Sequence, residues 1–283
     1  MRDASEQSER NAVTGTAIEP AIMVAAVRAG MAAILARSAA AGDVAYKSDR
    51  SPVTEADEAA ERAILAVIEA ACDIPVVAEE RFAAGKVPAL ARRFLLVDPL
   101  DGTKSFIAGA ADYTVNVALI EAGIPIFGCV GVPATGALYR GGVGSAPVVE
   151  RDGATLALGT RPAVSELDVV ASRDHLTPQT RDYLAAIPVR ERLSVGSSLK
   201  FCLLAEGQAD LYPRFGRTMQ WDTAAGDAIL RAAGGLTVTA SGMPLPYGLA
   251  GGPGEDPFAN PAFIAVGDRS LLRRAGILPR RDQ

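Results

Sequence analysis

A change of pattern near residues 150 to 165 constrains the fold of this chain more than any other feature. Before it, the segment 113–121 alternates, and an apolar strand over 124–132 follows an Ala-Gly turn, which is typical of a hairpin. After it, short apolar strands such as 168–172 alternate with helical segments such as 178–186. The pattern predicts two helices with a largely antiparallel sheet, followed by an α/β layer.

The predicted division of the 283-residue chain follows from this change. We expect a disordered polar tail over 1–17, an N-terminal α+β domain over 18–155 and a C-terminal α/β domain over 156–283. The fold class is therefore mixed, α+β in the first half and α/β in the second.

Two helices open the first domain. The segment 19–41 is rich in Ala, Met, Leu and Ile, and Gly42-Asp43 ends it. A second helix over 54–71 begins at Thr54, and an acidic residue three positions later resembles a capping box. The other predicted strands are 74–78, 94–97, 136–142, 193–195, 209–212, 236–239 and 263–266, and the other helices are 198–206, 222–233 and 269–275.

Composition excludes several classes of protein. The formal net charge is −5 and basic clusters are lacking, so a nucleic-acid polymer is not an expected partner. The apolar stretch 21–41 is interrupted by Arg28 and Arg37, and no transmembrane segment or apolar leader is predicted. The three cysteines are widely spaced and form no metal-ligand pair, which indicates a reducing, cytoplasmic location.

Carboxylates stand at the edges of predicted elements. Each has an ordinary interpretation alone, as a helix cap, a turn residue or a solvated pair. They are Asp57, Glu79-Glu80, Asp98, Asp101 and Asp222. A convergence of several ionised carboxylates would not persist without cations, because two of them at ~4 Å repel by about 4 kcal/mol near a protein surface.

The segment from Asp98 to Thr103 weakens those ordinary interpretations. Asp98 closes an apolar strand, and Pro99 fixes the backbone after it. Gly102 allows close backbone approach, so its N–H and that of Thr103 can meet an anion, and a helix beginning at Thr103 would favour phosphate there. Oxygen ligands without His or Cys spacing indicate magnesium, and the lone His175 cannot build a zinc site.

Four segments resemble the inositol monophosphatase superfamily of lithium-sensitive, magnesium-dependent phosphatases. They are Val53–Asp57, Ala78–Glu80, Val97–Phe106 and Trp221–Gly226. The resemblance implies a layered αβαβα sandwich of the sugar phosphatase type.

Within the superfamily, three further segments resemble the bacterial 3′(2′),5′-bisphosphate nucleotidases of the CysQ type. They are 172–175, 195–202 and 205–216. Such enzymes convert adenosine 3′,5′-bisphosphate to AMP and phosphate in sulfur assimilation.

The resemblance also implies roles for individual residues. It places two or three Mg²⁺ ions on Glu79, Asp98, the Leu100 carbonyl, Asp101 and Asp222. The catalytic residues would be Asp57 and Thr103, which resemble the pair that orients the attacking water, and Glu79, with Glu80 near a metal-bound water. The substrate contacts would be Glu79, Leu100, Asp101, Gly102, Thr103, Ser197, Lys200, Arg214, Asp222 and, as a weaker match, His175. Most metal ligands then fall in 18–155, and Asp222 and the nucleotide contacts in 156–283.

Several alternatives stay open. The same site chemistry could act on inositol monophosphate or fructose 1,6-bisphosphate. A haloacid dehalogenase-like phosphatase would use Asp-x-Asp-Gly-Thr, whereas here two residues separate the aspartates. A non-catalytic phosphate-binding protein is the third alternative. The chain could be a monomer or a homodimer, and the resemblance includes relatives on the cytoplasmic face of the inner membrane, so peripheral attachment is a further expectation.

Overall fold

The computed structural model describes most of the chain. The described residues are 18–37, 45–46, 52–172, 177–249, 256–274 and 277–278. The predicted tail over 1–17 and the candidate substrate contact His175 lie outside them. No helix of the described residues is long and apolar enough to cross a membrane.

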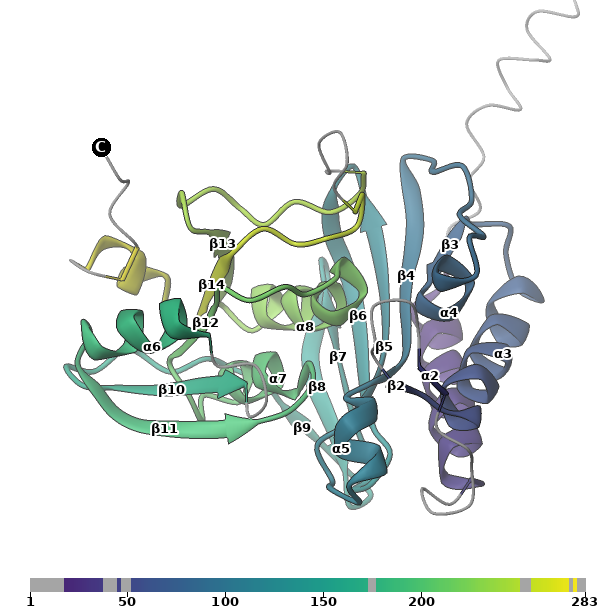
Figure 1. Ribbon diagram of the computed structural model, residues 1–283, viewed down its shortest axis with the longest axis horizontal. Coiled ribbons are helices and arrows are strands. Elements are labelled where there is room, and N and C mark those ends of the chain that lie inside the picture. Colours follow the sequence, from purple (N-terminus) through teal and green to yellow (C-terminus); the bar gives the residue numbers. More distant parts are fainter. Residues whose placement is uncertain are drawn as a thin grey trace, which may run out of the picture.

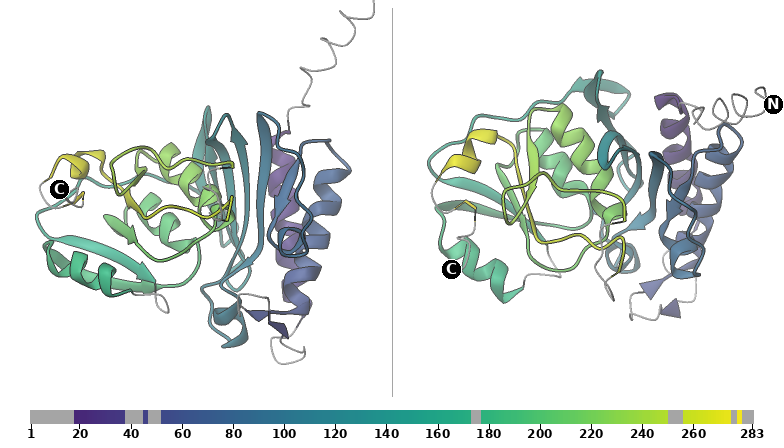
Figure 2. Two further views of the ribbon diagram at one scale, coloured as in Figure 1. Left: turned by 45° about the horizontal axis from the view of Figure 1, so that its top comes forward. Right: turned by 90° about the horizontal axis from the view of Figure 1, so that it is seen from above.

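Helices and sheets alternate in layers (Figure 1). Helices α2 (Pro20–Leu35) and α3 (Glu55–Glu69) cover one face of a seven-stranded sheet, and α7 (Leu199–Ala205) and α8 (Gln220–Ala232) lie between this sheet and a five-stranded one. Helix α6 (Pro178–Ala185) covers the outer face of the second sheet, and Figure 2 shows the same layers from two other sides. The predicted αβαβα sandwich is confirmed.

The seven-stranded sheet has the order β3-β4-β5-β6-β7-β8-β9, parallel only between β3 and β4. Its strands are β3 (Val76–Ala78), β4 (Arg93–Asp101), β5 (Thr114–Glu121), β6 (Ile124–Val132), β7 (Ala137–Gly142), β8 (Ser145–Arg151) and β9 (Ala154–Ala157). The last two were not predicted, because their side chains are mostly exposed or half-exposed and lack an apolar run. A short pair, β1 (Ala45–Tyr46) and β2 (Pro52–Val53), was also not predicted.

The five-stranded sheet has the order β11-β10-β12-β14-β13, with β10 parallel to both neighbours. Its strands are β10 (Leu167–Ser172), β11 (Val189–Val195), β12 (Leu211–Arg214), β13 (Leu236–Thr239) and β14 (Phe263–Val266). Alternate residues face opposite layers, as the two-residue period of a strand requires. Val170, Tyr212 and Phe263 join the core around α7 and α8, whereas Val169, Leu211 and Ile264 pack on the α6 side.

Several predicted elements differ from those in the structure. Helix α2 ends at Leu35 rather than residue 41, because its buried face stops at Ile34 and Leu35 is already exposed, so continued helix would gain little packing. Strand β11 begins at Val189, four residues before the predicted start at residue 193. Its first residues are mostly polar, and pairing with β10 holds them in the sheet. The last helix is a 3-10 helix, Arg269–Arg273.

Candidate active site

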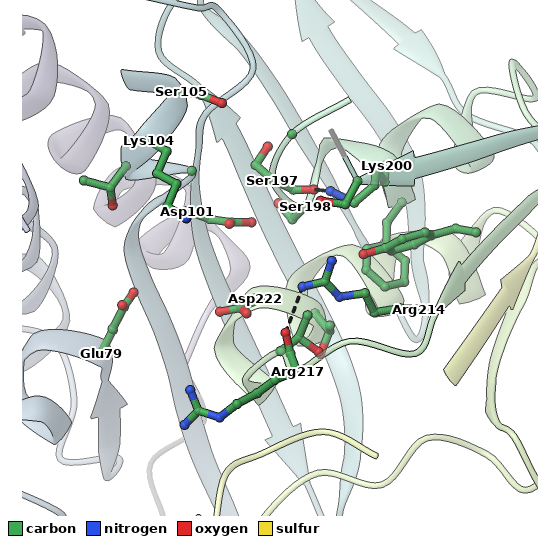
Figure 3. A pocket seen from close by; sticks show the side chains of 18 residues that line it. Glu79, Asp101, Lys104, Ser105, Ser197, Ser198, Lys200, Arg214, Arg217 and Asp222 are labelled. Atoms are coloured by element: carbon green, nitrogen blue, oxygen red, sulfur yellow. Dashed lines mark hydrogen bonds between the residues drawn. The ribbon is translucent and has the colours of Figure 1, made fainter. Parts of the chain in front are cut away.

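A cavity of about 250 Å³ lies where the two halves meet (Figure 3). Its wall comes from α4 (Glu79–Ala83), the turn into α5 (Thr103–Ile107), the start of α7, β12 and the start of α8. The predicted site residues that line it are Glu79, Asp101, Gly102, Thr103, Ser197, Lys200, Arg214 and Asp222. Asp57, Asp98 and Leu100 are buried and do not line the cavity.

Strand β4 carries the central turn of the site. The expected strand end at Asp98 was wrong, because β4 continues to Asp101 with an irregular register between these two residues. Such an irregularity lets a proline sit in the sheet and re-aims side chains. The Leu100 N–H donates to Asp98 Oδ1 at 3.0 Å, and Gly102, at φ +94°, ends the turn in a conformation that suits glycine before α5 begins.

Asp57 and Thr103 are in direct contact, as their predicted shared role requires. The Thr103 hydroxyl donates to Asp57 Oδ1 at 3.0 Å. The other carboxylate oxygen accepts from the Thr54 N–H at 2.8 Å and from the Thr54 hydroxyl at 2.7 Å, which completes the predicted capping box of α3. Burial raises the pKa of Asp57, and the two Thr54 bonds oppose that shift.

The carboxylates perturb one another. Burial, and then the charges of the neighbouring carboxylates, raises the pKa values of Asp98 and Asp222 well above their usual range. Burial also raises the pKa of Asp101 to about 6, against the attraction of the Lys200 ammonium. In Figure 3 the carboxylates of Glu79 and Asp222 turn toward each other, and that of Asp101 turns toward Ser198.

The donor set fits a hard cation, although the carboxylates do not yet surround one point. Within the described part of the chain, no three His, Cys, Asp or Glu side chains are already grouped as metal ligands. The raised pKa values show that full ionisation is costly for this group without a compensating positive charge. A bound cation would remove that cost and would draw the oxygens together.

Two buried cations, Lys200 and Arg214, line the other side of the same cavity. Lys200 is buried, and its ammonium donates to the Val195 carbonyl at 3.3 Å and to the Ser197 carbonyl, and lies 5.3 Å from the centre of the Tyr212 ring. Burial lowers the pKa of Lys200 to about 8, against the attraction of Asp101.

Arg214 is the second buried cation. Its Nη2 donates to the Arg217 carbonyl at 2.8 Å, whereas its buried Nε has no hydrogen-bond partner. A buried guanidinium with an unsatisfied donor is a ready partner for phosphate.

Sequence reasoning missed a polar cluster that joins the two halves. The Ser198 hydroxyl contacts Thr114 Oγ1 at 2.9 Å and Asn116 Oδ1 at 2.6 Å, and the Gly196 N–H donates to Asp112 Oδ2 at 2.6 Å. Thr114 and Asn116 interrupt the apolar run of β5, and both are fully buried. Polar residues inside an apolar strand were the available signal, since buried polar groups require partners.

Comparison with known proteins identifies the class to which this fold and site belong. A family model described as the inositol monophosphatase family matches residues 16–265. An inositol monophosphatase structure from Zymomonas mobilis is 25% identical, with a TM-score of 0.71 and coverage of 98% of each chain. The chain belongs to the inositol monophosphatase family.

Two further relatives bear one more specific name. A 3′(2′),5′-bisphosphate nucleotidase CysQ from Shigella flexneri is 45% identical over 222 residues, which are 78% of this chain and 87% of the relative. A crystal structure of CysQ from Bacteroides thetaiotaomicron is 33% identical, with a TM-score of 0.72, over 88% of this chain and 97% of that one. The predicted family resemblance, including its nucleotidase branch, is confirmed.

Proposed function

We propose that this protein is a 3′(2′),5′-bisphosphate nucleotidase that hydrolyses the 3′-phosphate of adenosine 3′,5′-bisphosphate to AMP and phosphate. The similarity to relatives named 3′(2′),5′-bisphosphate nucleotidase supports the substrate class. The observation that carries the proposal is the division of one cavity into an acidic side, with Asp101 and Asp222, and a buried cationic side, with Lys200 and Arg214. A substrate with two phosphates matches both sides.

The carboxylate side would hold the metal. Glu79, Asp98, Asp101, Asp222 and the Leu100 carbonyl are the proposed ligands of two or three Mg²⁺ ions. When bound, Mg²⁺ would supply positive charge that acidifies water and neutralises the phosphoryl oxygens. The residues of the chain fit this role because carboxylate and carbonyl oxygens are the ligands that Mg²⁺ prefers.

The remaining predicted residues orient the reactants. The Thr103 hydroxyl and Asp57 form a hydrogen-bonded pair that can fix a water molecule in line with the scissile bond and hold a proton from it. Backbone N–H groups of Gly102 and Thr103 would contact the scissile phosphate. Because Asp57 does not line the cavity, the proton would reach it through the Thr103 hydroxyl, which would take a proton from the water and give its own to Asp57 Oδ1, the atom to which it already donates.

The second phosphate would contact the cationic side. Ser197, Lys200 and Arg214 are its proposed partners, and the unsatisfied Arg214 Nε gives this assignment its physical basis. Binding energy from a phosphate that does not react can be used to raise kcat. The role of His175 stays a prediction, since His175 lies outside the described residues. The cytoplasmic location, with or without membrane attachment, and the choice between monomer and homodimer also stay predictions.

A substrate panel tests the proposal. With Mg²⁺ present, kcat/KM for adenosine 3′,5′-bisphosphate should exceed that for inositol 1-phosphate by at least about 100-fold, because a monophosphate leaves the cationic side without a partner. It should also exceed kcat/KM for fructose 1,6-bisphosphate, whose two phosphates are spaced differently from those of the nucleotide. Addition of Li⁺ should inhibit turnover. A preference for either sugar phosphate would contradict the substrate, and failure to hydrolyse any phosphate monoester would contradict the enzymatic function itself.

A further inference from the structure

Asp112 reaches from the first half of the chain to the turn that begins α7. It lies between α5 and β5 and is buried, and its Oδ2 accepts from the Gly196 N–H at 2.6 Å across 84 residues of sequence. The turn residues Gly196, Ser197 and Ser198 line the cavity, whereas Asp112 does not. Any effect of Asp112 on a ligand in the cavity must therefore pass through the turn or through the Lys200 ammonium, which lines the cavity and which Asp112 attracts.

The contact is too close to permit a side chain on Gly196. A Cβ atom built there would lie 2.8 Å from the Asp112 carbonyl oxygen and 2.9 Å from Oδ2. Carbon and oxygen at such distances overlap, so an alanine would push the turn away from Asp112. The turn is therefore held against Asp112 by close packing as well as by a hydrogen bond.

The neighbouring Ser197 is held in an uncommon conformation. Its φ is +49°, a region that L-amino acids other than glycine seldom occupy and that costs of order 1 kcal/mol or more. The Lys200 ammonium donates to the carbonyls on both sides of Gly196, those of Val195 and Ser197. Asp112 also attracts the Lys200 ammonium. The carboxylate on one side and the ammonium on the other together fix the turn.

We propose that Asp112 is a positioning residue that holds the Gly196–Ser197 turn in the shape needed for the second, non-reacting phosphate, and so sets the preference for bisphosphates over monophosphates. This inference rests on the proposed nucleotidase function. Asp112 would not touch the substrate or the metal ligands. Its loss should weaken recognition at the cationic side and should spare the chemistry at the carboxylate side.

Two nucleotides with the same scissile group separate these effects. Adenosine 3′,5′-bisphosphate and adenosine 3′-monophosphate differ only in the 5′-phosphate. Asp112→Ala should raise KM for the bisphosphate about tenfold or more, because a charged acceptor is lost, with kcat changed less. The ratio of the two kcat/KM values should fall by the same factor. Asp112→Asn keeps an oxygen acceptor for the Gly196 N–H and should restore most of the ratio.

Further variants keep the test decisive. Gly196→Ala should reproduce the loss, and it replaces Asp112→Ala if that variant does not fold. Asp182→Ala on α6, which removes an exposed carboxylate that does not line the cavity, is the matched control and should behave as wild type. Binding of AMP to the metal-free protein, measured by calorimetry, should weaken about tenfold in Asp112→Ala, without any contribution from catalysis.

The outcomes distinguish this inference from the proposed function. If wild type prefers the bisphosphate and both Asp112→Ala and Gly196→Ala keep that preference, the inference about Asp112 is wrong and the function stands. Equal losses on both nucleotides would also contradict a role confined to the second phosphate. If wild type neither prefers the bisphosphate nor binds AMP more tightly than adenosine, both proposals are overturned.

Discussion

At the scale of single residues, the site is defined by charges that the fold buries at a cost. Asp98 is buried, Asp101 and Asp222 are half-buried at the cavity wall, and Lys200 and Arg214 are buried opposite them. Isolated buried charges would neutralise or destabilise the fold, and partners of opposite sign make them tolerable. The arrangement suits cations on the carboxylate side of the cavity and a phosphate on the Lys200 and Arg214 side.

Lys200 gives a prediction for the dependence on pH. Its pKa of about 8 lies below the ordinary value for lysine, so the folded protein loses this positive charge as the pH rises through 8. We expect KM for adenosine 3′,5′-bisphosphate to rise between pH 7.5 and 9.5 by about tenfold per unit at the upper end. The Lys200→Arg variant, which keeps its charge over this range, should show a flat KM. A flat profile in wild type would contradict the role of Lys200.

Asp222 gives a prediction that separates activity from stability. Asp222→Asn should lower kcat at least about 1,000-fold, since one of the proposed metal ligands is lost. Asparagine can still accept from the Met219 N–H, which the native carboxylate does at 2.9 Å, so the start of α8 should persist. In the metal-free protein the melting temperature should stay equal or increase, because one repelling charge is removed. Near-native kcat, with the control Asp182→Asn unchanged, would refute the assignment.

At the scale of elements, α8 links the two sheets and carries Asp222 into the site. Gly128 on β6 allows this approach, because a Cβ atom there would lie 2.2 Å from the Ala225 carbonyl oxygen of α8. The sequence shows Gly128 only as a residue inside an apolar strand, so its role depends on a contact between segments about 100 positions apart.

Gly128→Ala is therefore expected to destabilise the protein by about 1–3 kcal/mol and to lower kcat, because α8 must shift with Asp222. Gly159→Ala is the matched control, since a Cβ atom at that exposed position meets nothing within 4 Å. Denaturant unfolding and turnover measure the two effects. Equal stability and activity in the two variants would contradict the proposed dependence of the site on this close packing.

The elements also show what the sequence could predict. Apolar runs and the Thr54 cap located α3, β5, β6 and α8 because local periodicity and capping determine them. The continuation of β4 past Asp98 could not be predicted from the local sequence, because Pro99 normally argues against a strand. Only pairing with β5 keeps this part of the chain in the sheet.

The candidate site also has residues that the sequence could predict and residues that it could not. The carboxylates were identified because they follow recognisable strand ends and helix starts. Asp112, Thr114, Asn116 and Ser198 were missed because their significance arises from contacts between the two halves. Neither periodicity nor spacing within one segment reports such contacts.

At the scale of the whole molecule, two sheets of different topology bring one site together. Glu79, Asp98 and Asp101 come from the seven-stranded sheet and its connections, whereas Asp222 starts a helix that lies between the sheets (Figure 1). A cation bound by residues of both parts would tie them together. We therefore expect saturating Mg²⁺ to raise the melting temperature by several degrees relative to chelator.

The Asp222→Asn variant is the control for that thermal shift. Its response to Mg²⁺ should be much smaller, because one of the ligands that joins the halves is gone. An identical thermal shift in wild type and variant would mean that Mg²⁺ stabilises the fold from another site.

The central claim is that the carboxylates of the site are assembled to hold divalent cations beside a phosphoryl group. Crystals grown with Mn²⁺ and AMP, with anomalous diffraction used to locate the metal, test it most directly. The account predicts anomalous peaks within about 2.5 Å of oxygens from Glu79, Asp98, Asp101 and Asp222. Peaks confined to other surfaces, with these four side chains unmoved and metal-free, would contradict it.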